Sequence, residues 1–567
     1  MRIASFKGGK DWGYRAVRKI FNYIPASFIT KKKSWQWLRF YPAIIPAQYC
    51  FNEWNKAIKD KDYHNYQIWI DQNSLATLEA WRLLQQKSYY WQSPPKISIV
   101  TPVHNTQVDV LYECIVSVRA QAYPYWQLIL VDDGSSNIET HKLLKSGVCK
   151  DPRIQVHFTH QSQGISGATN IAIQKSQGDY IVFLDHDDRL ALDALYLVAD
   201  EIRKYPKVDI VYSDRDMISP KGKRYMYLFK PGWSPETLLA GNYIFHLMCY
   251  RRSLVDQLGG LRTEFDGSQD YDLILRAAET APQVRHIQKV LYHWRQYQGS
   301  VSLDSGAKDY AFEAGVKALN EAMQRRGIAG KALEITALWR GNYQLDLVCP
   351  EIAEIEVIRI STTQPIEEYT QFVNHSIQEG DKPYIAIISQ SLTAVNDNAL
   401  CHLAAWLKID GVGLATGGII TEEKLIDYVG ATYQIEGELM IPYQGLPISE
   451  PGYMAVTQLT RNISAPHPYC IVVRRELWQQ LNGLNTDYQG FYSLLDFSLR
   501  ALAFDWRCVS VPQAQFMTTQ TGLSEHYTEQ DKQLFYRTWQ DWLDKGDPYY
   551  NLNLARDCQE RLYHLPG

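Results

Sequence analysis

The chain lacks the features that mark several large protein classes. No uninterrupted apolar run approaches the roughly 20 residues that cross a bilayer, and the basic N-terminus has no apolar segment of the signal-peptide kind. The nine cysteines are odd in number and include no CxxC pair. We therefore expect neither a disulfide framework nor a zinc site, and a reducing, cytoplasmic location fits this pattern.

Motifs for phosphate and calcium are also missing. The sequence contains no GxxxxGK[ST] loop, which cradles phosphates in many nucleotide hydrolases, and no EF-hand calcium loop. Aromatic residues, by contrast, make up 13% of the chain. Aromatic side chains pack in cores and also stack on ring-shaped ligands, so both uses are open.

A net positive charge is confined to the first 50 residues. The chain has a net charge of −4, yet residues 1–50 hold ten Lys or Arg and one acid, Asp11, which gives +9 and leaves −13 for the remainder. Aromatic residues lie between these cations. Such a segment favours a membrane surface, with an ordinary basic helix or tail as the alternative. The acidic remainder disfavours nucleic acid.

Strand and helix patterns alternate along the first half of the chain. A helical region covers 50–93, expected strands cover 96–105, 126–136, 179–188 and 208–214, and expected helices cover 109–122, 164–178 and 191–205. This alternation predicts an open, mostly parallel α/β sheet, in which ligands bind beyond the carboxyl ends of the strands. Polar residues fall at those ends: His104, Asn105, Asp132, Asp133, Asp185, His186, Asp187, Asp188 and Asp214.

The turn at residues 185–188, Asp-His-Asp-Asp, is the strongest of these signals. Adjacent ionisable side chains repel one another and are costly to bury. Carboxylates at a strand end suit a divalent cation that also binds substrate phosphates. A solvated acidic turn is the alternative, and the turn alone does not decide between the two.

Four further segments carry weaker signals. Asp133 ends a strand in VDDGSS, where it can bind a nucleoside or simply form an Asp-Gly turn. Gly164 opens a helix in QGISGATN, which suits phosphate contact or plain structure. Asp270 precedes a helix and can serve as a general base, whereas helix capping explains Asp272. His293 ends an expected strand and either packs or completes a metal site.

Taken in order, these motifs resemble family 2 glycosyltransferases of the GT-A fold. PxxN, VDDGS, GIS-x-AxN, LDxDD, YSD, a Gly-Gly loop before QDYDLxLR, and YHWR follow one another within residues 60–345. The chain is most similar to large bacterial enzymes of surface-polysaccharide and rhamnan assembly, which often begin with a YQxWI helix like that at 65–73. The resemblance implies inverting transfer of a sugar from a nucleotide sugar to a hydroxyl, with Mn²⁺ or Mg²⁺.

The resemblance also implies roles for individual residues. Asp270 would be the general base, and Asp187 would bind the metal together with Asp185 and His293. Asp133 would hold the base of the nucleotide. Further nucleotide-binding residues would be Pro102, Asn105, Asp132, Gly164, Asn170, Asp185 and His186, and residues supporting the site or the acceptor would be Asp214, Asp272 and Trp294. Many relatives have Arg just before the Asn at 170, where this chain has Thr169, which weakens the phosphate assignment.

The second half looks like a shortened, inactive copy of the first. Residues 251–277 align with 474–501 after one insertion, with about half of the positions identical, which predicts two related domains. Leu494 stands where the first copy has Asp270. We predict an N-terminal region at 1–95, a GT-A domain at 96–345 and a degenerate GT-A-like domain at 346–567, which packs on the first or binds acceptor glycan.

Our main hypothesis is an inverting hexosyl- or deoxyhexosyltransferase that extends a surface glycan such as O-antigen or capsule. Its expected partners are a UDP-, dTDP- or GDP-linked sugar and a glycan or lipid-linked glycan acceptor, at the inner face of the cytoplasmic membrane. The alternative is a non-catalytic assembly or glycan-binding subunit on the same scaffold. A nucleotidyltransferase is disfavoured, because its GGxGTRL-type loop is absent.

Overall fold

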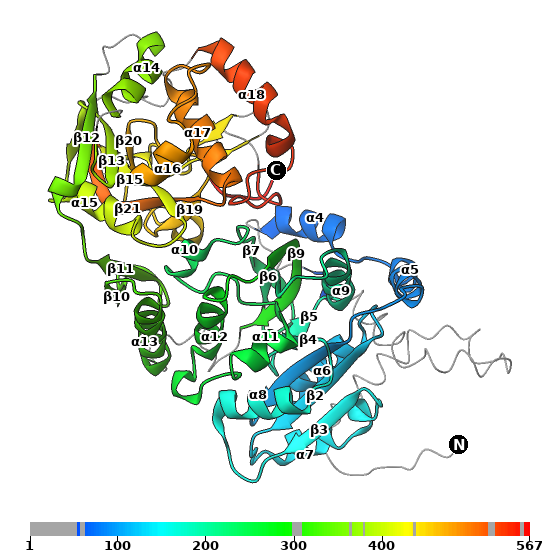
Figure 1. The fold of residues 1–567 in the computed structure, drawn as a ribbon. Coiled ribbons are helices and arrows are strands. Elements are labelled where there is room, and N and C mark those ends of the chain that lie inside the picture. Colours follow the sequence, from blue (N-terminus) through cyan, green and yellow to red (C-terminus); the bar gives the residue numbers. More distant parts are fainter. Residues whose placement is uncertain are drawn as a thin grey trace, which may run out of the picture. The chain divides into compact units, whose positions relative to one another are not determined.

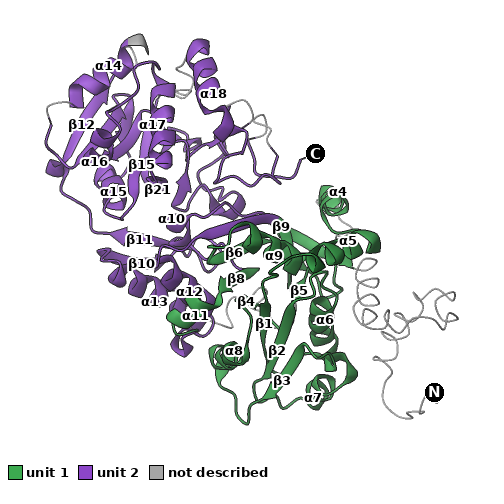
Figure 2. Ribbon diagram, turned by 45° about the vertical axis from the view of Figure 1, so that its right-hand side comes forward, with its two compact units in different colours: residues 1–228, 246–260, 289–303 green, residues 229–245, 261–288, 304–567 purple. Residues whose placement is uncertain are grey.

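The computed structural model describes residues 54–56, 63–296, 309–361, 366–377, 380–434, 438–519, 528–555 and 561–566. The basic segment at 1–50, and with it the predicted membrane surface, lies outside these residues. The chain forms two compact units, each assembled from separate stretches (Figure 2). Unit 1 comprises residues 1–228, 246–260 and 289–303, and unit 2 comprises 229–245, 261–288 and 304–567.

Within the described residues, two helices precede the sheet of unit 1, where the sequence predicts one helical region. They are α4 (His64–Asn73) and α5 (Leu78–Tyr89). Thr77 caps α5 by accepting a hydrogen bond from the Ala80 N–H (3.1 Å), which starts a new helix after the break. Tyr66, Trp69 and Ile70 of α4 are buried at helical spacing, so this helix packs one face inward.

The sheet of unit 1 has the strand order β3-β2-β1-β4-β8-β6-β9-β5, with β7 beside β6 (Figure 1; β1 and β8 are labelled in Figure 2). Its strands are β1 (Ile97–Val103), β2 (Trp126–Asp132), β3 (Ile154–Phe158), β4 (Tyr180–Phe183), β5 (Arg189–Leu190), β6 (Ile210–Ile218), β7 (Arg224–Leu228), β8 (Met248–Arg251) and β9 (Val284–Arg295). The three pairings from β3 to β4 are parallel, whereas β8 is antiparallel to both β4 and β6. The predicted open α/β sheet is confirmed, with its parallel part confined to β3, β2, β1 and β4.

Apolar sequence explains the centre of this sheet. Every residue of β1 and β2 is buried, which matches the near-continuous apolar runs expected of strands covered on both faces. Besides α4 and α5, the described helices of this unit are α6 (Val108–Arg119), α7 (Ile138–Leu144), α8 (Gly164–Lys175), α9 (Ala194–Lys204) and α11 (Arg252–Gln257). Loops that leave the carboxyl ends of β1, β2 and β4 therefore emerge at one edge, as the sequence predicts.

Unit 2 contains a second sheet, with the order β12-β13-β20-β15-β21-β14. Its strands are β12 (Ile355–Ile360), β13 (Tyr384–Ser389), β14 (Leu392–Ala394), β15 (Val412–Thr421), β20 (Cys470–Arg474) and β21 (Arg507–Thr518), with β16 (Ile426–Tyr428) and β19 (Arg461–Ile463) alongside. Its helices are α14 (Ile366–Ile377), α15 (Ala399–Trp406), α16 (Arg475–Gln480), α17 (Phe491–Ala503) and α18 (Glu529–Leu543). We call this region the C-terminal sheet.

The same unit also takes in elements that precede residue 346. They are the short helix α10 (Pro235–Leu238), α12 (Gln269–Ala278), α13 (Asp309–Arg325) and the hairpin of β10 (Gly330–Glu334) and β11 (Tyr343–Leu347). Figure 2 colours these segments with the C-terminal sheet. The compact unit thus crosses the chain position at which the sequence suggests a domain boundary.

Candidate active site

One acid of the predicted 185–188 turn is a structural anchor. Asp188 is fully buried, and its carboxylate accepts hydrogen bonds from the Tyr292 hydroxyl (2.5 Å) and the Arg295 N–H (2.7 Å). Burial raises the pKa of Asp188, and the neighbouring Asp187 and Asp185 add to this effect. Because Asp188 is occupied in this way, it ties the turn to β9 and is not available to a ligand.

The other two acids of the turn remain accessible. The side chains of Asp185 and Asp187 are 39% and 17% exposed. His246 Nε2 lies 3.8 Å from Asp185 Oδ2, and His186 Nδ1 lies 4.0 Å from Asp187 Oδ1. The His246 ring stacks on Tyr292, with 4.7 Å between ring centroids. The turn therefore presents two carboxylates with imidazoles beside them.

This arrangement fits a divalent cation that is shared with a substrate. Among the residues that the structure describes, no group of three or more His, Cys, Asp or Glu side chains could hold a metal ion. Mg²⁺ and similar hard cations are commonly bound by one or two carboxylates plus substrate phosphates. Asp185 and Asp187 supply oxygen ligands of that kind, so the residues present suit such an ion.

His293 lies on the opposite face of β9 from this turn. Side chains alternate along a strand, so Tyr292 and Trp294 face one way and His293 faces the other. His293 Nδ1 lies 2.6 Å from Asp216 Oδ1, inside unit 1. Burial lowers the pKa of His293 to about 4. The expectation that His293 joins Asp187 at a metal is corrected on this geometry, because its ring is directed to Asp216.

The residues around Asp216 form a buried charge network. Tyr66 of α4 donates its hydroxyl to Asp216 Oδ2 (2.5 Å), and Arg224 Nε also lies 2.5 Å from that oxygen. Burial alone would raise the pKa of Asp216, but Arg224 and His293 lower it to about 2. Asp214 is likewise fully buried, in the middle of β6. The expectation that the strand ends at Asp214 is therefore wrong, because β6 continues to Ile218.

The loops after β1 and β2 hold each other in place. Asn105 has a φ of 47°, and its Oδ1 accepts hydrogen bonds from the N–H groups of Ser136 (2.9 Å) and Asn137 (3.0 Å). His104 Nδ1 lies 2.8 Å from the carbonyl oxygen of Asp133. Pro102 lies in β1 beside Val131 of β2. The structure thus brings the predicted nucleotide-binding loops together.

Asp133 fixes the start of α8. Its carboxylate accepts hydrogen bonds from the Ser162 hydroxyl (2.6 Å) and from the N–H groups of Gln163 (2.7 Å) and Gly164 (3.1 Å). A carboxylate at a helix N-terminus is stabilised by these donors and by the helix dipole. Asp132 is also buried, with its Oδ2 2.8 Å from His141 Nε2.

Asn170 and Trp294 also belong to unit 1. A Cβ atom at Gly260, whose φ is +76°, would lie 2.5 Å from Asn170 Oδ1, so only glycine permits this close approach. The Trp294 ring lies 6.5 Å from the His246 ring, and the Arg215 guanidinium lies 4.6 Å from its centroid. Trp294 therefore shares the face of β9 that carries Tyr292.

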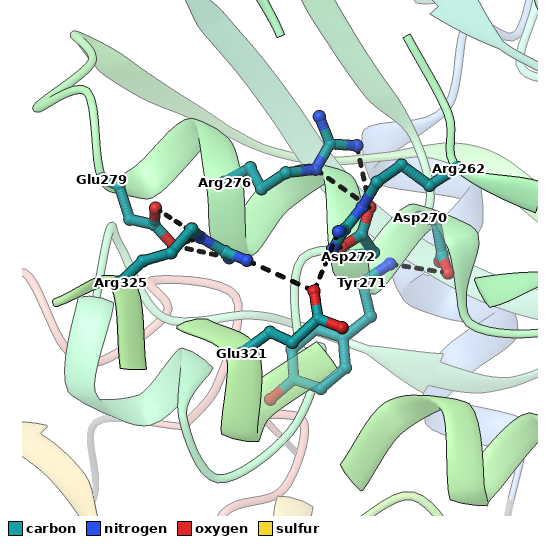
Figure 3. Close-up of polar contacts among 8 residues, drawn as sticks. All are labelled: Arg262, Asp270, Tyr271, Asp272, Arg276, Glu279, Glu321 and Arg325. Carbon is teal, nitrogen blue, oxygen red and sulfur yellow. Dashed lines mark hydrogen bonds and ion pairs between the residues drawn. The ribbon is translucent and has the colours of Figure 1, made fainter. Parts of the chain in front are cut away.

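Asp270 belongs to unit 2, at the first turn of α12. Its Oδ1 accepts a hydrogen bond from the Tyr271 N–H (2.8 Å; Figure 3), and its Oδ2 accepts one from Asn242 Nδ2 (3.1 Å). Burial raises the pKa of Asp270 to about 6. A carboxylate that titrates close to neutral pH is well matched to general-base catalysis.

Asp272 has a different role from its neighbour. It is fully buried and pairs with Arg262 and with Arg276, whose Nη2 lies 2.8 Å from Asp272 Oδ2 (Figure 3). The expectation that Asp272 caps the helix is corrected, because its carboxylate is bound by two guanidinium groups. It supports α12, and Arg262 extends the network to Glu321 of α13 (2.8 Å).

Three residues of these surroundings were missed by sequence reasoning: His246, Tyr292 and Asn242. Tyr292 could have been found from strand alternation in KVLYHWR, which places it on the same face as Trp294. His246 and Asn242 lie in a loop region without a recognisable pattern, and only the tertiary structure brings them to Asp185 and Asp270.

Comparison with known proteins relates one segment of the chain to a family. Residues 98–259 match the sequence model of glycosyl transferase family 2. The chain is 30% identical over 540 residues to the uncharacterized protein y4gI of Sinorhizobium fredii, covering 84% of this chain and 59% of that relative. It is 28% identical over 532 residues to the O-antigen biosynthesis protein RfbC of Myxococcus xanthus, covering 83% and 42%. The chain thus spans about half the length of these relatives.

A solved structure of S. aureus TarS 1–349 in complex with UDP-GlcNAc aligns with 40% of this chain and 66% of that chain, at 18% identity and a TM-score of 0.34. The family match confirms the resemblance that the motifs predict. The segment at 98–259 is thus of the glycosyl transferase family 2 type, and the sheet of unit 1, to which it contributes most strands, is of the GT-A type.

Proposed function

We propose that the protein is an inverting glycosyltransferase that moves a hexose or deoxyhexose from a nucleotide sugar to a hydroxyl of a growing surface glycan. The observation that carries this proposal is the turn at Asp185–Asp188, in which one acid anchors the loop and two remain accessible beside the nucleotide loops. Similarity to an O-antigen biosynthesis protein supports a polysaccharide product.

In this proposal, the loops after β1, β2 and β4 bind the donor. Asn105, Asp133 and Asp185 would contact the nucleoside, and Asp185 and Asp187 would hold Mn²⁺ or Mg²⁺. Such an ion, when bound, neutralises charge on a departing diphosphate. Asp270 would accept the proton of the acceptor hydroxyl as that oxygen attacks the sugar from the face opposite the leaving group. One displacement of this kind inverts the anomeric centre.

We further propose that residues 346–567 derive from a duplicated transferase domain that has lost catalysis. The helices compared in the two halves carry the same internal ion pair, Asp272–Arg276 in α12 and Asp496–Arg500 (2.7 Å) in α17. Leu494 replaces the proposed base in the second of them. This similarity supports a duplication, and we propose 1–95, 96–345 and 346–567 as regions of the sequence, which differ from the compact units of the fold.

The site of action that we propose is the cytoplasmic side of a membrane that carries a lipid-linked acceptor. No helix in the described part of the chain has the length and apolar character needed to cross a bilayer. The +9 charge of residues 1–50 supports attachment to an anionic surface, since basic residues near such a surface each contribute about 1 kcal/mol.

A thermal-shift screen tests the proposal directly. UDP, dTDP, GDP and CMP would each be added with Mn²⁺ or with EDTA to the wild-type chain and to Asp187→Ala. A ligand at 100 times its dissociation constant adds about 2.7 kcal/mol to the free energy of unfolding, so binding is readily detected. We expect one nucleotide to raise the melting temperature only with Mn²⁺ and only in the wild type.

The control is Asp256→Ala, which removes a surface carboxylate of α11 that pairs only with Arg252 of the next turn back among the contacts described (3.3 Å). It should keep the metal-dependent shift. If no nucleotide stabilises the wild type, the non-catalytic assembly subunit becomes the better description, and the acidic turn is a solvated surface loop.

A further inference from the structure

The segment at 229–245, which we call the bridging segment, carries the residue that binds the proposed general base. It contains α10 and Asn242, and it lies wholly within unit 2. Asn242 Nδ2 donates to Asp270 Oδ2 (3.1 Å). Whatever fixes the bridging segment therefore also fixes one of the two hydrogen bonds described for the Asp270 carboxylate.

A buried ion pair ties the bridging segment to the C-terminal sheet. Glu236 is fully buried, and Arg507 of β21 binds both of its carboxylate oxygens, with Nε–Oε2 and Nη2–Oε1 distances of 2.8 Å. Asn462 of β19 adds a hydrogen bond from Nδ2 to Glu236 Oε2 (2.7 Å). A bidentate Arg–carboxylate pair fixes orientation as well as distance.

Backbone groups of the bridging segment are bound to the same sheet. Asn462 Oδ1 accepts hydrogen bonds from the N–H groups of Glu236 (3.1 Å) and Thr237 (3.2 Å), and the Asn462 N–H donates to Thr237 Oγ1 (3.0 Å). Ala240 packs in an apolar cluster with Ala455 and Leu459. One asparagine thus satisfies three polar groups at the start of α10, which has no side-chain cap of its own.

The other side of the bridging segment contacts the helix that carries Asp270. The Tyr271 hydroxyl donates to the Leu238 carbonyl oxygen (2.6 Å), and the Tyr271 ring stacks on Tyr343 at 5.8 Å. The Tyr343 N–H donates to the Ala240 carbonyl oxygen (2.9 Å). Only five residues, 237–241, therefore lie between Glu236, which is held by its ion pair, and Asn242, which is bonded to Asp270.

We propose that the C-terminal sheet positions the general base: Arg507 and Asn462 hold Glu236, and the bridging segment fixed in this way presents Asn242 to Asp270. The inference rests on the proposed role of Asp270. Arg507, Asn462 and Glu236 are positioning residues that touch no substrate. The degenerate half of the chain thus keeps a function in catalysis after losing its own acids.

The test replaces the ion pair in the full chain with apolar residues of similar size, Glu236→Leu with Arg507→Met. Removing both partners avoids the large cost of a buried unpaired charge. Hydrolysis of UDP-glucose, UDP-GlcNAc, dTDP-rhamnose and GDP-mannose in water is followed by nucleotide release, which needs no glycan acceptor. We expect kcat to fall about 10- to 100-fold, since small misplacement of a catalytic group costs this much, with KM unchanged and the acidic limb of the pH profile displaced.

A matched control replaces another ion pair of the C-terminal sheet, Glu356→Leu with Arg475→Met, in which Arg475 is also largely buried. It should change kcat by less than about twofold. Hydrogen exchange over residues 269–278 gives a second readout that is independent of turnover. Exchange there should accelerate in the Glu236→Leu/Arg507→Met chain and remain at the wild-type rate in the control.

Asp270→Asn separates the two proposals. Loss of hydrolysis in Asp270→Asn, with no further loss when the Glu236→Leu/Arg507→Met changes are added, shows that the pair acts through Asp270. Wild-type hydrolysis in Asp270→Asn overturns the role of Asp270 and this inference with it. Wild-type exchange over residues 269–278 in the Glu236→Leu/Arg507→Met chain overturns the positioning role alone.

Discussion

Burial of Asp270 suits its carboxylate to act as a general base and also lowers the stability of the folded chain at neutral pH. Its pKa is raised by burial to about 6, so the folded chain binds a proton more tightly than the unfolded chain between about pH 4 and pH 6. The free energy of unfolding therefore falls as the pH rises through that window, and the ionised carboxylate destabilises the fold at neutral pH.

Replacing Asp270 by Asn should reverse both effects. The amide keeps the shape of the side chain but cannot accept the acceptor proton, so transfer should fall by at least about 100-fold, and the melting temperature at pH 8 should exceed that of the wild type. Activity of the wild type should decline as the pH drops below about 6. Melting curves at pH 5 and pH 8 with rate profiles check this, and unchanged transfer by the variant would reassign the base.

For single residues, the sequence predicts the position of polar side chains after the strands better than it predicts the role of each side chain. Asp185 and Asp187 follow the apolar strand β4, where acids that end such a strand emerge, although the strand itself ends at Phe183 rather than at 188. Asp188 was indistinguishable from them in sequence. Only its contacts with Tyr292 and Arg295, which lie more than 100 positions away, make it a structural residue.

At the scale of elements, β9 separates two environments. Tyr292 and Trp294 face the acidic turn, and His293 faces Tyr66, Asp216 and Arg224 through the charge network. The continuous apolar strands β1 and β2 could be predicted because burial on both faces leaves a continuous apolar run. The length of β6 could not, since the Asp216 carboxylate inside the sheet is bound by Tyr66 and His293, which are distant in the chain.

Substitution of His293 by Gln tests this reading of β9. We expect a loss of about 1–3 kcal/mol in the free energy of unfolding, because a buried hydrogen bond to an ionised carboxylate is removed. The Mn²⁺ dependence of nucleotide binding should remain as in the wild type. If the variant has normal stability but its nucleotide binding no longer depends on Mn²⁺, His293 is a metal ligand after all.

At the scale of the whole molecule, charge is divided between a basic N-terminal segment and an acidic remainder. Residues 1–50 carry +9. After their deletion, the protein should remain at the bottom of the gradient in a flotation assay and no longer float with anionic vesicles. Binding of the wild type should weaken as ionic strength rises, because surface electrostatics are screened. Equal flotation of the deleted chain would show that this segment has another purpose.

The division into compact units also bears on how such a protein can be rebuilt from parts. Residues 229–245 and 261–288 are encoded before residue 346, yet they fold together with the C-terminal sheet. A gene cut at the apparent repeat boundary would leave Glu236 as a buried acid without Arg507. Glu236 lies before the repeat boundary, and Asn462 and Arg507 lie after it. A chimaera of two relatives joined at that boundary should therefore fold only if both relatives have the same residues at these three positions.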